Sequence, residues 1–176
     1  MSDLLTTVTI RIATEADLPL MEWNGQYTHF RRLYQEVYES SLRGEAILWV
    51  AELNGTGLIG QVFVQLESAR KELADGAQRA YIYGFRIQSA YRGHGLGSYM
   101  LGMVEGDLVR RGFRIAVLNV SRENSEARQL YERQGYRIVA AEPGQWSYLD
   151  EEGERHWVDE PAWRMEKELE PLINNK

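Results

Sequence analysis

The most informative segment of this sequence is Tyr91-Arg92-Gly93-His94-Gly95-Leu96-Gly97. It lies between an aromatic-rich, strand-like run at 80–88 and a segment at 98–111 whose apolar residues recur at helical spacing. Alternate glycines let backbone N–H groups approach an anion, and the N-terminus of a following helix attracts negative charge. We therefore expect a phosphate-binding turn between a strand and a helix.

The glycine-rich turn does not identify its ligand by itself. No Gly-Lys-Ser/Thr follows it, and its third glycine stands two residues after the second, whereas the dinucleotide fingerprint requires three. A tight strand-to-helix connection that binds nothing fits the same glycines equally well. The neighbouring segments must therefore indicate whether the turn binds a ligand.

The segments after the turn predict a strand–helix–strand crossover. Residues 115–120 form a short, almost wholly apolar run, which is typical of a strand covered on both faces by helices. Asn124 is a suitable N-cap for the next helix, and Gly135 is placed to end it. Further strands are expected at 136–140 and 163–169, with an extra hairpin within 146–159.

The segments before the turn predict an antiparallel sheet. Strand-like runs lie at 8–12, 47–51, 58–64 and 80–88. The Asn54-Gly55 pair between the second and third runs favours a hairpin turn. Helices are expected to begin at Thr14 and to cover 27–43, and the polar segment 67–78 indicates a surface loop.

Length and composition indicate one compact domain over residues 1–176. The chain is 44% hydrophobic and 26% charged, which is close to globular averages. Its formal net charge of -6 argues against a nucleic-acid partner and favours a cationic acceptor. Residues 1–7 lack the basic and apolar regions of a signal peptide, and no run is long enough to span a membrane, so a cytoplasmic location without a membrane partner is expected.

The absence of cysteine restricts the chemistry. Without a thiol, the chain forms no disulfide, no thiolate metal site and no covalent thioester of its own. Acyl transfer from a thioester must then be direct or use another nucleophile. We expect no metal site.

The turn and the segment after it together resemble a known family. Residues 91–97 resemble the Arg/Gln-x-x-Gly-x-Gly/Ala signature of the GCN5-related N-acetyltransferase superfamily, and residues 124–136 resemble its Asn-x-x-Ala-x-x-x-Tyr-x-x-x-Gly-Phe/Tyr segment. The resemblance is specific over 80–136 and looser outside it. It implies a mixed α/β fold: a mostly antiparallel mixed sheet of about seven strands, flanked by about four helices, with an extra C-terminal hairpin here.

The resemblance also implies acetyl-CoA as co-substrate. Backbone amides of the turn would take the CoA pyrophosphate, and the fourth strand would pair with the pantetheine arm as if with an added strand. The implied cofactor-binding residues are Phe85, Arg86, Ile87, Arg92, Gly93, His94, Gly95, Leu96, Gly97, Ser98, Asn124 and Tyr131. His94 would contribute its backbone, with its side chain in solvent.

Tyr131 is the implied catalytic residue. The family commonly places a tyrosine at this position near the thioester sulfur, where it can protonate the departing thiolate. Tyr131 also shares an apolar helical face with Leu130, so a plain core tyrosine is the alternative. Asn124 has the similar alternative of being only a helix cap.

No general base is evident in the sequence, although a primary amine must lose a proton before it attacks. Asn119 stands where the related ribosomal-protein alanine acetyltransferases carry a glutamate base, and Gly84 leaves the fourth strand without a carboxylate. The candidates that would act through water are Glu22, His29, Tyr83 and Glu142. Each also fits an ordinary surface or packing residue, so no single base is predicted.

Aromatic residues of the first helical region and the last strands could wall an acceptor pocket. The expected substrate residues are Trp23, Tyr27, His29, Tyr83 and Trp146. The hairpin aromatics could instead pack onto the domain or form a homodimer contact. A polyamine, an aminoglycoside and a protein amine all remain open as acceptors.

Three functions are compatible with these observations. The first is an acetyl-CoA-dependent N-acetyltransferase, in which a primary amine of a small molecule or protein attacks the thioester directly. The second is a non-catalytic acyl-CoA sensor, suggested by the missing carboxylates at Asn119 and Gly84. The third is an assembly protein on the same fold, with the aromatic hairpin as its partner surface.

Overall fold

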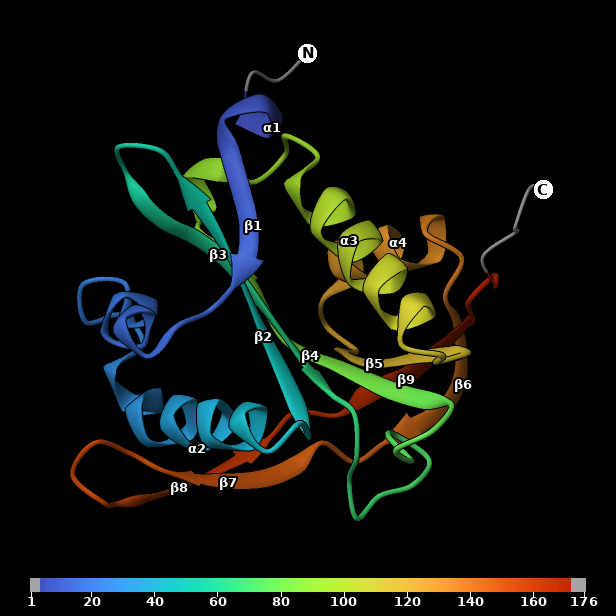
Figure 1. Ribbon diagram of the computed structural model, residues 1–176. Helices are drawn as coiled ribbons and strands as arrows, with labels where there is room; N and C mark the ends of the chain where they lie inside the picture. The colour runs from blue at the N-terminus through green and yellow to red at the C-terminus, as the bar shows by residue number, and fades with distance from the viewer. Residues whose placement is uncertain (1–3, 172–176) are drawn as a thin grey trace.

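The computed structural model describes residues 4–171, and its centre is one seven-stranded sheet in the order β1-β2-β3-β4-β5-β9-β6 (Figure 1). The strands are β1 (Val8–Ile12), β2 (Ala46–Leu53), β3 (Gly57–Gln65), β4 (Arg79–Ile87), β5 (Ile115–Ser121), β6 (Arg137–Glu142) and β9 (Ala162–Glu168). Every neighbouring pair is antiparallel except β4 and β5, which run parallel. The expected mixed, mostly antiparallel sheet is therefore confirmed.

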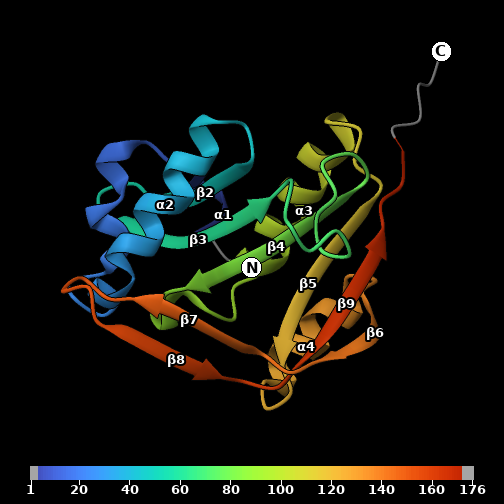
Figure 2. The ribbon, with the colours of Figure 1, turned by 90° about the horizontal axis from the view of Figure 1, so that it is seen from below.

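Helices cover both faces of this sheet. They are α1 (Leu4–Thr7), α2 (Arg31–Leu42), α3 (Leu96–Arg110) and α4 (Ser125–Arg133). α3 and α4 lie on one face, and α2 lies on the other beside the extra hairpin of β7 (Gln145–Leu149) and β8 (Arg155–Asp159) (Figures 1 and 2). Within residues 4–171, no helix is both long and apolar enough to cross a membrane.

The segment between β1 and α2 departs from the expected helices. Short 3-10 turns replace the helix expected from Thr14, at Glu15–Asp17, Pro19–Glu22 and Thr28–Phe30. Pro19 lacks a backbone N–H, and Trp23 ends the second turn in the left-handed conformation with φ of 46°. The α-helix expected over 27–43 consequently begins only at Arg31.

The sheet separates two apolar cores. On one face, Met100 and Leu108 of α3 are fully buried against the strands. On the other face, the ring of Tyr34 from α2 packs edge-on against Phe63 of β3, with ring centroids 5.6 Å apart. β3 is therefore covered on both faces, and all but its two end residues are buried.

β4 and β5 are paired only over their first halves. Their register ends at Ile82 and Leu118. β4 continues beside β3 as far as Ile87, and β5 continues beside β9 as far as Ser121. Figure 2 shows the arrowheads of β4 and β5 pointing apart. The sheet therefore opens at the carboxyl ends of these two strands.

A β-bulge at Gly84 accompanies this opening. The register between β3 and β4 shifts between Gln61 and Phe63, so one residue of β3 stands opposite two of β4, which bends the bulged strand. Gly84 has φ of +59°, and a Cβ atom there would lie 2.5 Å from the Phe63 ring. The missing carboxylate at this position thus has a packing reason, because only glycine fits.

A partly buried ion pair between Arg11 and Asp17 fixes the chain just after β1. The Arg11 guanidinium donates to both carboxylate oxygens of Asp17, at 2.7 and 2.9 Å, and the Thr14 backbone N–H donates to the same carboxylate at 2.7 Å. The hydrogen bond from Arg11 holds the pKa of Asp17 below its usual range. The ionised form of Asp17 therefore stabilises the fold.

We expect Asp17→Asn to lower the free energy of unfolding at neutral pH by about 2 kcal/mol. Because the folded-state pKa of Asp17 is depressed, its contribution is present above the unfolded pKa and is lost as the pH falls through the folded value. Urea unfolding at several pH values should therefore show a shallower acid dependence in the variant. Glu52→Gln removes the exposed partner of Arg11, at 2.8 Å, and should cost less than about 1 kcal/mol. Equal losses in the two variants would contradict this assignment.

Candidate active site

The glycine-rich turn opens onto a cavity of about 560 Å³. Gly93 and Gly95 adopt φ of +78° and +82°, and Gly95 is the N-cap of α3. Arg92 Nε donates to the Ile87 carbonyl at 2.9 Å, which ties the turn to the end of β4. Residues expected to hold a cofactor line this cavity, namely Phe85, Arg86, Ile87, Arg92, Gly93, Gly95, Leu96, Gly97, Ser98, Asn124 and Tyr131. His94 lies outside that lining, and its exposed ring donates from Nδ1 to the Arg92 carbonyl at 2.9 Å.

The three glycines of the turn have different roles. A Cβ atom at Gly93 would meet nothing within 4 Å, and one at Gly95 would meet only Leu5, at 3.8 Å. These two positions therefore present bare backbone to open space at the start of a 15-residue helix, as an anion cradle requires. At Gly97, a Cβ would touch Leu130 at 3.4 Å, so the third glycine lets α3 pack closely against α4.

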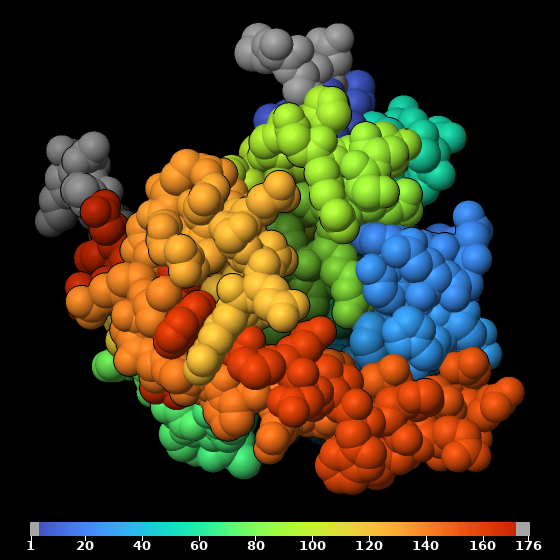
Figure 3. Space-filling model, turned by 180° about the vertical axis from the view of Figure 1, so that it is seen from behind, coloured from blue at the N-terminus to red at the C-terminus, as the bar shows by residue number. Residues whose placement is uncertain are grey.

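A second cavity of about 660 Å³ lies on the α2 side of the opening between β4 and β5. It shares Phe85, Arg86, Asn124, Ala127 and Tyr131 with the cavity of the turn, so the two cavities adjoin at these residues. Figure 3 shows the hollow on this face, with the green chain of β4 inside it, between the yellow-orange segment after β5 and the blue N-terminal segment. We call the larger space the acceptor cavity.

Asn124 caps α4 and also lines both cavities. Its Oδ1 atom accepts a hydrogen bond from the Ala127 backbone N–H at 3.1 Å, so it caps α4. The same residue lines both cavities. Capping therefore leaves the side chain at the junction, where a ligand passing between β4 and β5 would meet it.

Tyr131 also lines both cavities, and its ring packs at 64° against Tyr136 with centroids 6.0 Å apart. Burial, with a smaller contribution from Tyr81, raises the pKa of Tyr131 to about 12. The phenol is therefore protonated at neutral pH and available as a hydrogen-bond donor. Burial also raises the pKa of Tyr83, which stacks on Tyr81 with centroids 5.4 Å apart.

The carboxylates considered as bases are engaged by arginines. Arg31 donates to both oxygens of Glu22 at 2.9 Å, and these hydrogen bonds lower the pKa of Glu22. Glu142 accepts hydrogen bonds from Arg70 at 2.9 and 3.1 Å and from Arg164 at 3.0 Å. Glu142 lines the acceptor cavity, whereas Glu22 lies outside its lining.

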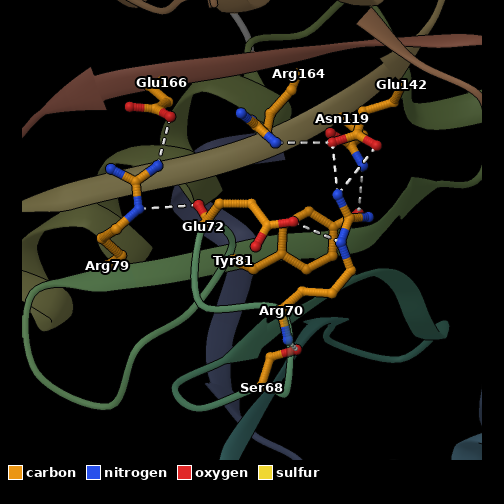
Figure 4. A network of polar contacts seen from close by, with 9 residues as sticks. All are labelled: Ser68, Arg70, Glu72, Arg79, Tyr81, Asn119, Glu142, Arg164 and Glu166. Carbon is orange, nitrogen blue, oxygen red and sulfur yellow. Dashed lines mark hydrogen bonds and ion pairs between the residues drawn. The ribbon is translucent and has the colours of Figure 1, made fainter. Parts of the chain in front are cut away.

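A polar network joins the loop before β4 to the ends of β5, β6 and β9 (Figure 4). Arg70 bridges Glu72 and Glu142, and Asn119 Nδ2 donates to the Tyr81 hydroxyl at 3.2 Å. Asn119 Oδ1 is buried without a hydrogen-bond partner among residues 4–171. Asn119 thus occupies the wall of the acceptor cavity as a neutral amide bound to a neutral phenol.

Sequence reasoning missed the contribution of the loop at 67–78. It was expected to be a surface loop, yet Arg70 and Leu73 line the acceptor cavity, and Ala74 is fully buried. The apolar pair Leu73-Ala74 within a polar segment was the signal that could have found it.

The aromatic residues expected to bind the acceptor divide into two groups. Tyr83 and Trp146 line the acceptor cavity. Trp23, Tyr27 and His29 lie outside its lining and form an aromatic cluster beside its wall, in which His29 packs on Phe30 with centroids 4.3 Å apart. Phe30 connects the two groups, because it lines the cavity and contacts both His29 and Trp146.

Arg86 points toward the acceptor cavity rather than toward the turn. Its Nη1 donates to the Tyr34 hydroxyl at 2.8 Å, and its guanidinium lies over the rings of Tyr27 and Phe30, at 4.3 and 4.7 Å from their centroids. Its neighbour Phe85 instead packs in the core with α3 and α4. Successive side chains of a strand point to opposite faces, which separates Arg86 from the cradle.

Gly144 holds the hairpin against the acceptor cavity. It has φ of +66°, and a Cβ atom there would lie 1.7 Å from the Glu160 carbonyl oxygen. We expect Gly144→Ala to displace the base of the hairpin and to lower the free energy of unfolding by about 3 kcal/mol, measured by chemical denaturation. Gly153→Ala, at the hairpin tip with φ of +83°, would meet only the end of the Arg32 side chain and should cost about 1 kcal/mol. An equally stable Gly144→Ala protein would contradict the prediction.

The comparison with protein families agrees with this architecture. The Acetyltransferase (GNAT) family model matches residues 14–136 of this chain. The chain belongs to the GNAT acetyltransferase family. The matched residues include the glycine-rich turn, the opening between β4 and β5, and α4.

Relatives of this GNAT chain are distant. It is 30% identical over 90 residues to the uncharacterized N-acetyltransferase YycN of Bacillus subtilis (strain 168). The alignment covers 51% of this chain and 54% of YycN, so the chain spans about half the length of that relative.

Solved structures share the GNAT fold over nearly the whole chain. The ribosomal-protein-S18-alanine N-acetyltransferase from Escherichia coli has a TM-score of 0.68 and 19% identity, covering 96% of this chain and 98% of that one. NAA60 of Arabidopsis thaliana in complex with acetyl-CoA has a TM-score of 0.69 and 21% identity, covering 93% and 99%. At these identities the likeness shows the common fold.

Proposed function

We propose that this GNAT chain is an N-acetyltransferase that moves the acetyl group of acetyl-CoA directly onto a primary amine of a small molecule or protein. The opening between β4 and β5 carries the proposal, because the cavity of the turn and the acceptor cavity adjoin there, and Tyr131 and Asn124 line both. A thioester entering from the first cavity and an amine entering from the second would meet at this junction.

The residues present fit acetyl-CoA as co-substrate. The bare backbone of Gly93 and Gly95 at the start of α3 suits a pyrophosphate, and Ser98 supplies a hydroxyl in the same cavity. Among residues 4–171, no strand pairs with β4 beyond Ile82 on its β5 side, which suits an extended amide-bearing arm. Bound acetyl-CoA supplies the activated acyl group, and the protein places it.

Tyr131 is proposed to assist departure of the thiolate. With a pKa of about 12, its phenol is a weaker acid than a thiol, whose pKa is about 8.5. The group therefore suits donation of a hydrogen bond to the developing thiolate better than complete transfer of its proton. A donor fixed where charge develops accelerates the reaction in this way.

Proton removal from the amine is assigned to water in the acceptor cavity rather than to Glu22 or Glu142. Both carboxylates already accept charge-assisted hydrogen bonds from arginines. The pairing of Glu22 and Glu142 with arginines also suits an acyl-CoA sensor without turnover, so the experiment must separate the two functions.

Two measurements test the proposal. Calorimetric titration should show acetyl-CoA binding, and a thiol-reactive dye should detect CoA release when a panel of primary amines is added. Binding without CoA release from any amine would favour the sensor. No binding of acetyl-CoA to the folded protein would overturn both functions and leave the assembly role.

A further inference from the structure

The charges of the acceptor cavity indicate what else its ligand must carry. The charged side chains that line the cavity are Arg70, Arg86, Glu142 and Glu160. Arg70 and Glu142 are paired with each other and are further satisfied by Glu72 and Arg164. Glu160 is an exposed carboxylate at the base of the hairpin, where its backbone N–H donates to the Gly144 carbonyl at 2.9 Å.

Arg86 is the cavity cation that lacks an acidic partner. Among residues 4–171, its guanidinium forms no ion pair with a carboxylate, and its hydrogen bond goes to the neutral Tyr34 hydroxyl. A guanidinium carries five N–H donors, so most of the Arg86 donors are free for a ligand. The rings of Tyr27 and Phe30 hold the group in place without neutralising its charge.

This arrangement suits a planar anion. A fixed guanidinium fork matches the two oxygens of a carboxylate, and a side chain already held by rings and a hydroxyl loses little freedom on binding. The walls beside Arg86 are apolar, from Phe30, Leu33 and Trp146, and suit a hydrophobic body. The volume of about 660 Å³ falls within the usual range for small-molecule sites.

We propose that the Arg86 guanidinium binds a carboxylate of the acceptor, so that the substrate is a small amino acid-like amine with an apolar side chain. The inference rests on the proposed function, because it names the acceptor class of the same site. It differs from the cationic acceptor expected from the net charge, since that charge describes the whole surface and not the cavity.

The test uses matched acceptors that differ only in the carboxylate. Leucine, methionine and phenylalanine are compared with 3-methylbutylamine, 3-(methylthio)propylamine and 2-phenylethylamine, and CoA release gives kcat/KM for each. We expect the carboxylate to raise kcat/KM by about 10- to 100-fold in the wild type, as for a charge-assisted hydrogen bond. Arg86→Met should remove this preference. Equal rates within every wild-type pair would overturn the proposal.

Further variants separate charge, geometry and folding. Arg86→Lys keeps the charge without the fork and should retain only part of the preference. Arg137→Met removes an exposed arginine on β6 and should leave the preference for the carboxylate unchanged. Acetyl-CoA affinity should be unaltered in Arg86→Met. A tenfold loss of that affinity would assign the guanidinium to the cofactor and overturn the proposal.

An equilibrium arm distinguishes failure of this inference from failure of the proposed function. N-Acetylleucine and N-(3-methylbutyl)acetamide are titrated into the wild type and Arg86→Met in the presence of CoA. If N-acetylleucine binds more tightly than N-(3-methylbutyl)acetamide to the wild type but not to Arg86→Met, the anion site is supported. This holds even if no amine releases CoA, and only the acetyltransferase activity is then overturned. If amines release CoA but neither the kinetic nor the binding experiment shows a preference for the carboxylate, the acetyltransferase function stands and the anion site is overturned. If neither the ligands that carry a carboxylate nor their counterparts without one bind or react, the anion site is also overturned.

Discussion

Gly95→Trp is expected to weaken acetyl-CoA binding by at least about 100-fold, because an indole would fill the space that the N-cap of α3 leaves for the pyrophosphate. A Cβ at this position meets only Leu5, at 3.8 Å, so the new side chain can enter the cavity without unfolding the core. Loss of contacts with the helix N-terminus removes the main anion site. Calorimetric titration of acetyl-CoA measures the effect directly.

The control for backbone strain is Gly55→Trp. Gly55 lies in the β2–β3 turn with φ of +80°, close to the +82° of Gly95, and has open space around it. Both variants pay a similar cost of about 1–2 kcal/mol for a left-handed residue. Only Gly95→Trp should lose the ligand. If the folded Gly95→Trp protein binds acetyl-CoA with undiminished affinity, the cofactor does not bind at the turn.

Tyr131→Phe is expected to lower kcat by about 100-fold with little change in acetyl-CoA affinity. The ring and its packing against Tyr136 are kept, while the donor to the departing thiolate is removed. Steady-state kinetics with the best amine of the panel give kcat, and calorimetry gives the affinity. Because burial raises the pKa of Tyr131 to about 12, the wild-type phenol should stay protonated across the alkaline range in which amine acceptors lose their proton.

Tyr136→Phe is the matched control for Tyr131→Phe. The Tyr136 hydroxyl donates to Glu105 Oε2 at 2.8 Å and lies outside the linings of both cavities. This variant should lower the free energy of unfolding by about 1 kcal/mol and leave kcat intact. A Tyr131→Phe enzyme with wild-type kcat would reduce Tyr131 to a core tyrosine, which was the alternative from its helical position.

The order of strands and helices was predictable because its signals are local. The alternation in β1, the Asn-Gly turn between β2 and β3, and the helical spacing in α3 each depend on neighbouring residues. The prediction failed between β1 and α2, where 3-10 turns replace a helix. There Pro19 and the left-handed Trp23 override the helix start signalled at Thr14.

That the residues of the glycine-rich turn would line one cavity was predictable for the same reason. The glycine-rich turn is one contiguous segment before α3. Its residues therefore lie together at the cavity whatever position α3 takes in the fold. The acceptor side combines separate segments, such as Arg70, Arg86 and Trp146. Pairing between strands determines which of their side chains face each other, and no local pattern encodes that.

The GNAT fold and the position of the glycine-rich turn between a strand and a helix followed from the sequence alone, because both depend on short-range spacing and glycine conformation. The pairing of charges at and near the acceptor cavity followed only from the three-dimensional structure. Glu22, outside the lining, and Glu142, within it, are paired with arginines from other segments, whereas Arg86 is held by rings and a hydroxyl. Charge compensation depends on distances across the fold, and these exist only once the chain has packed.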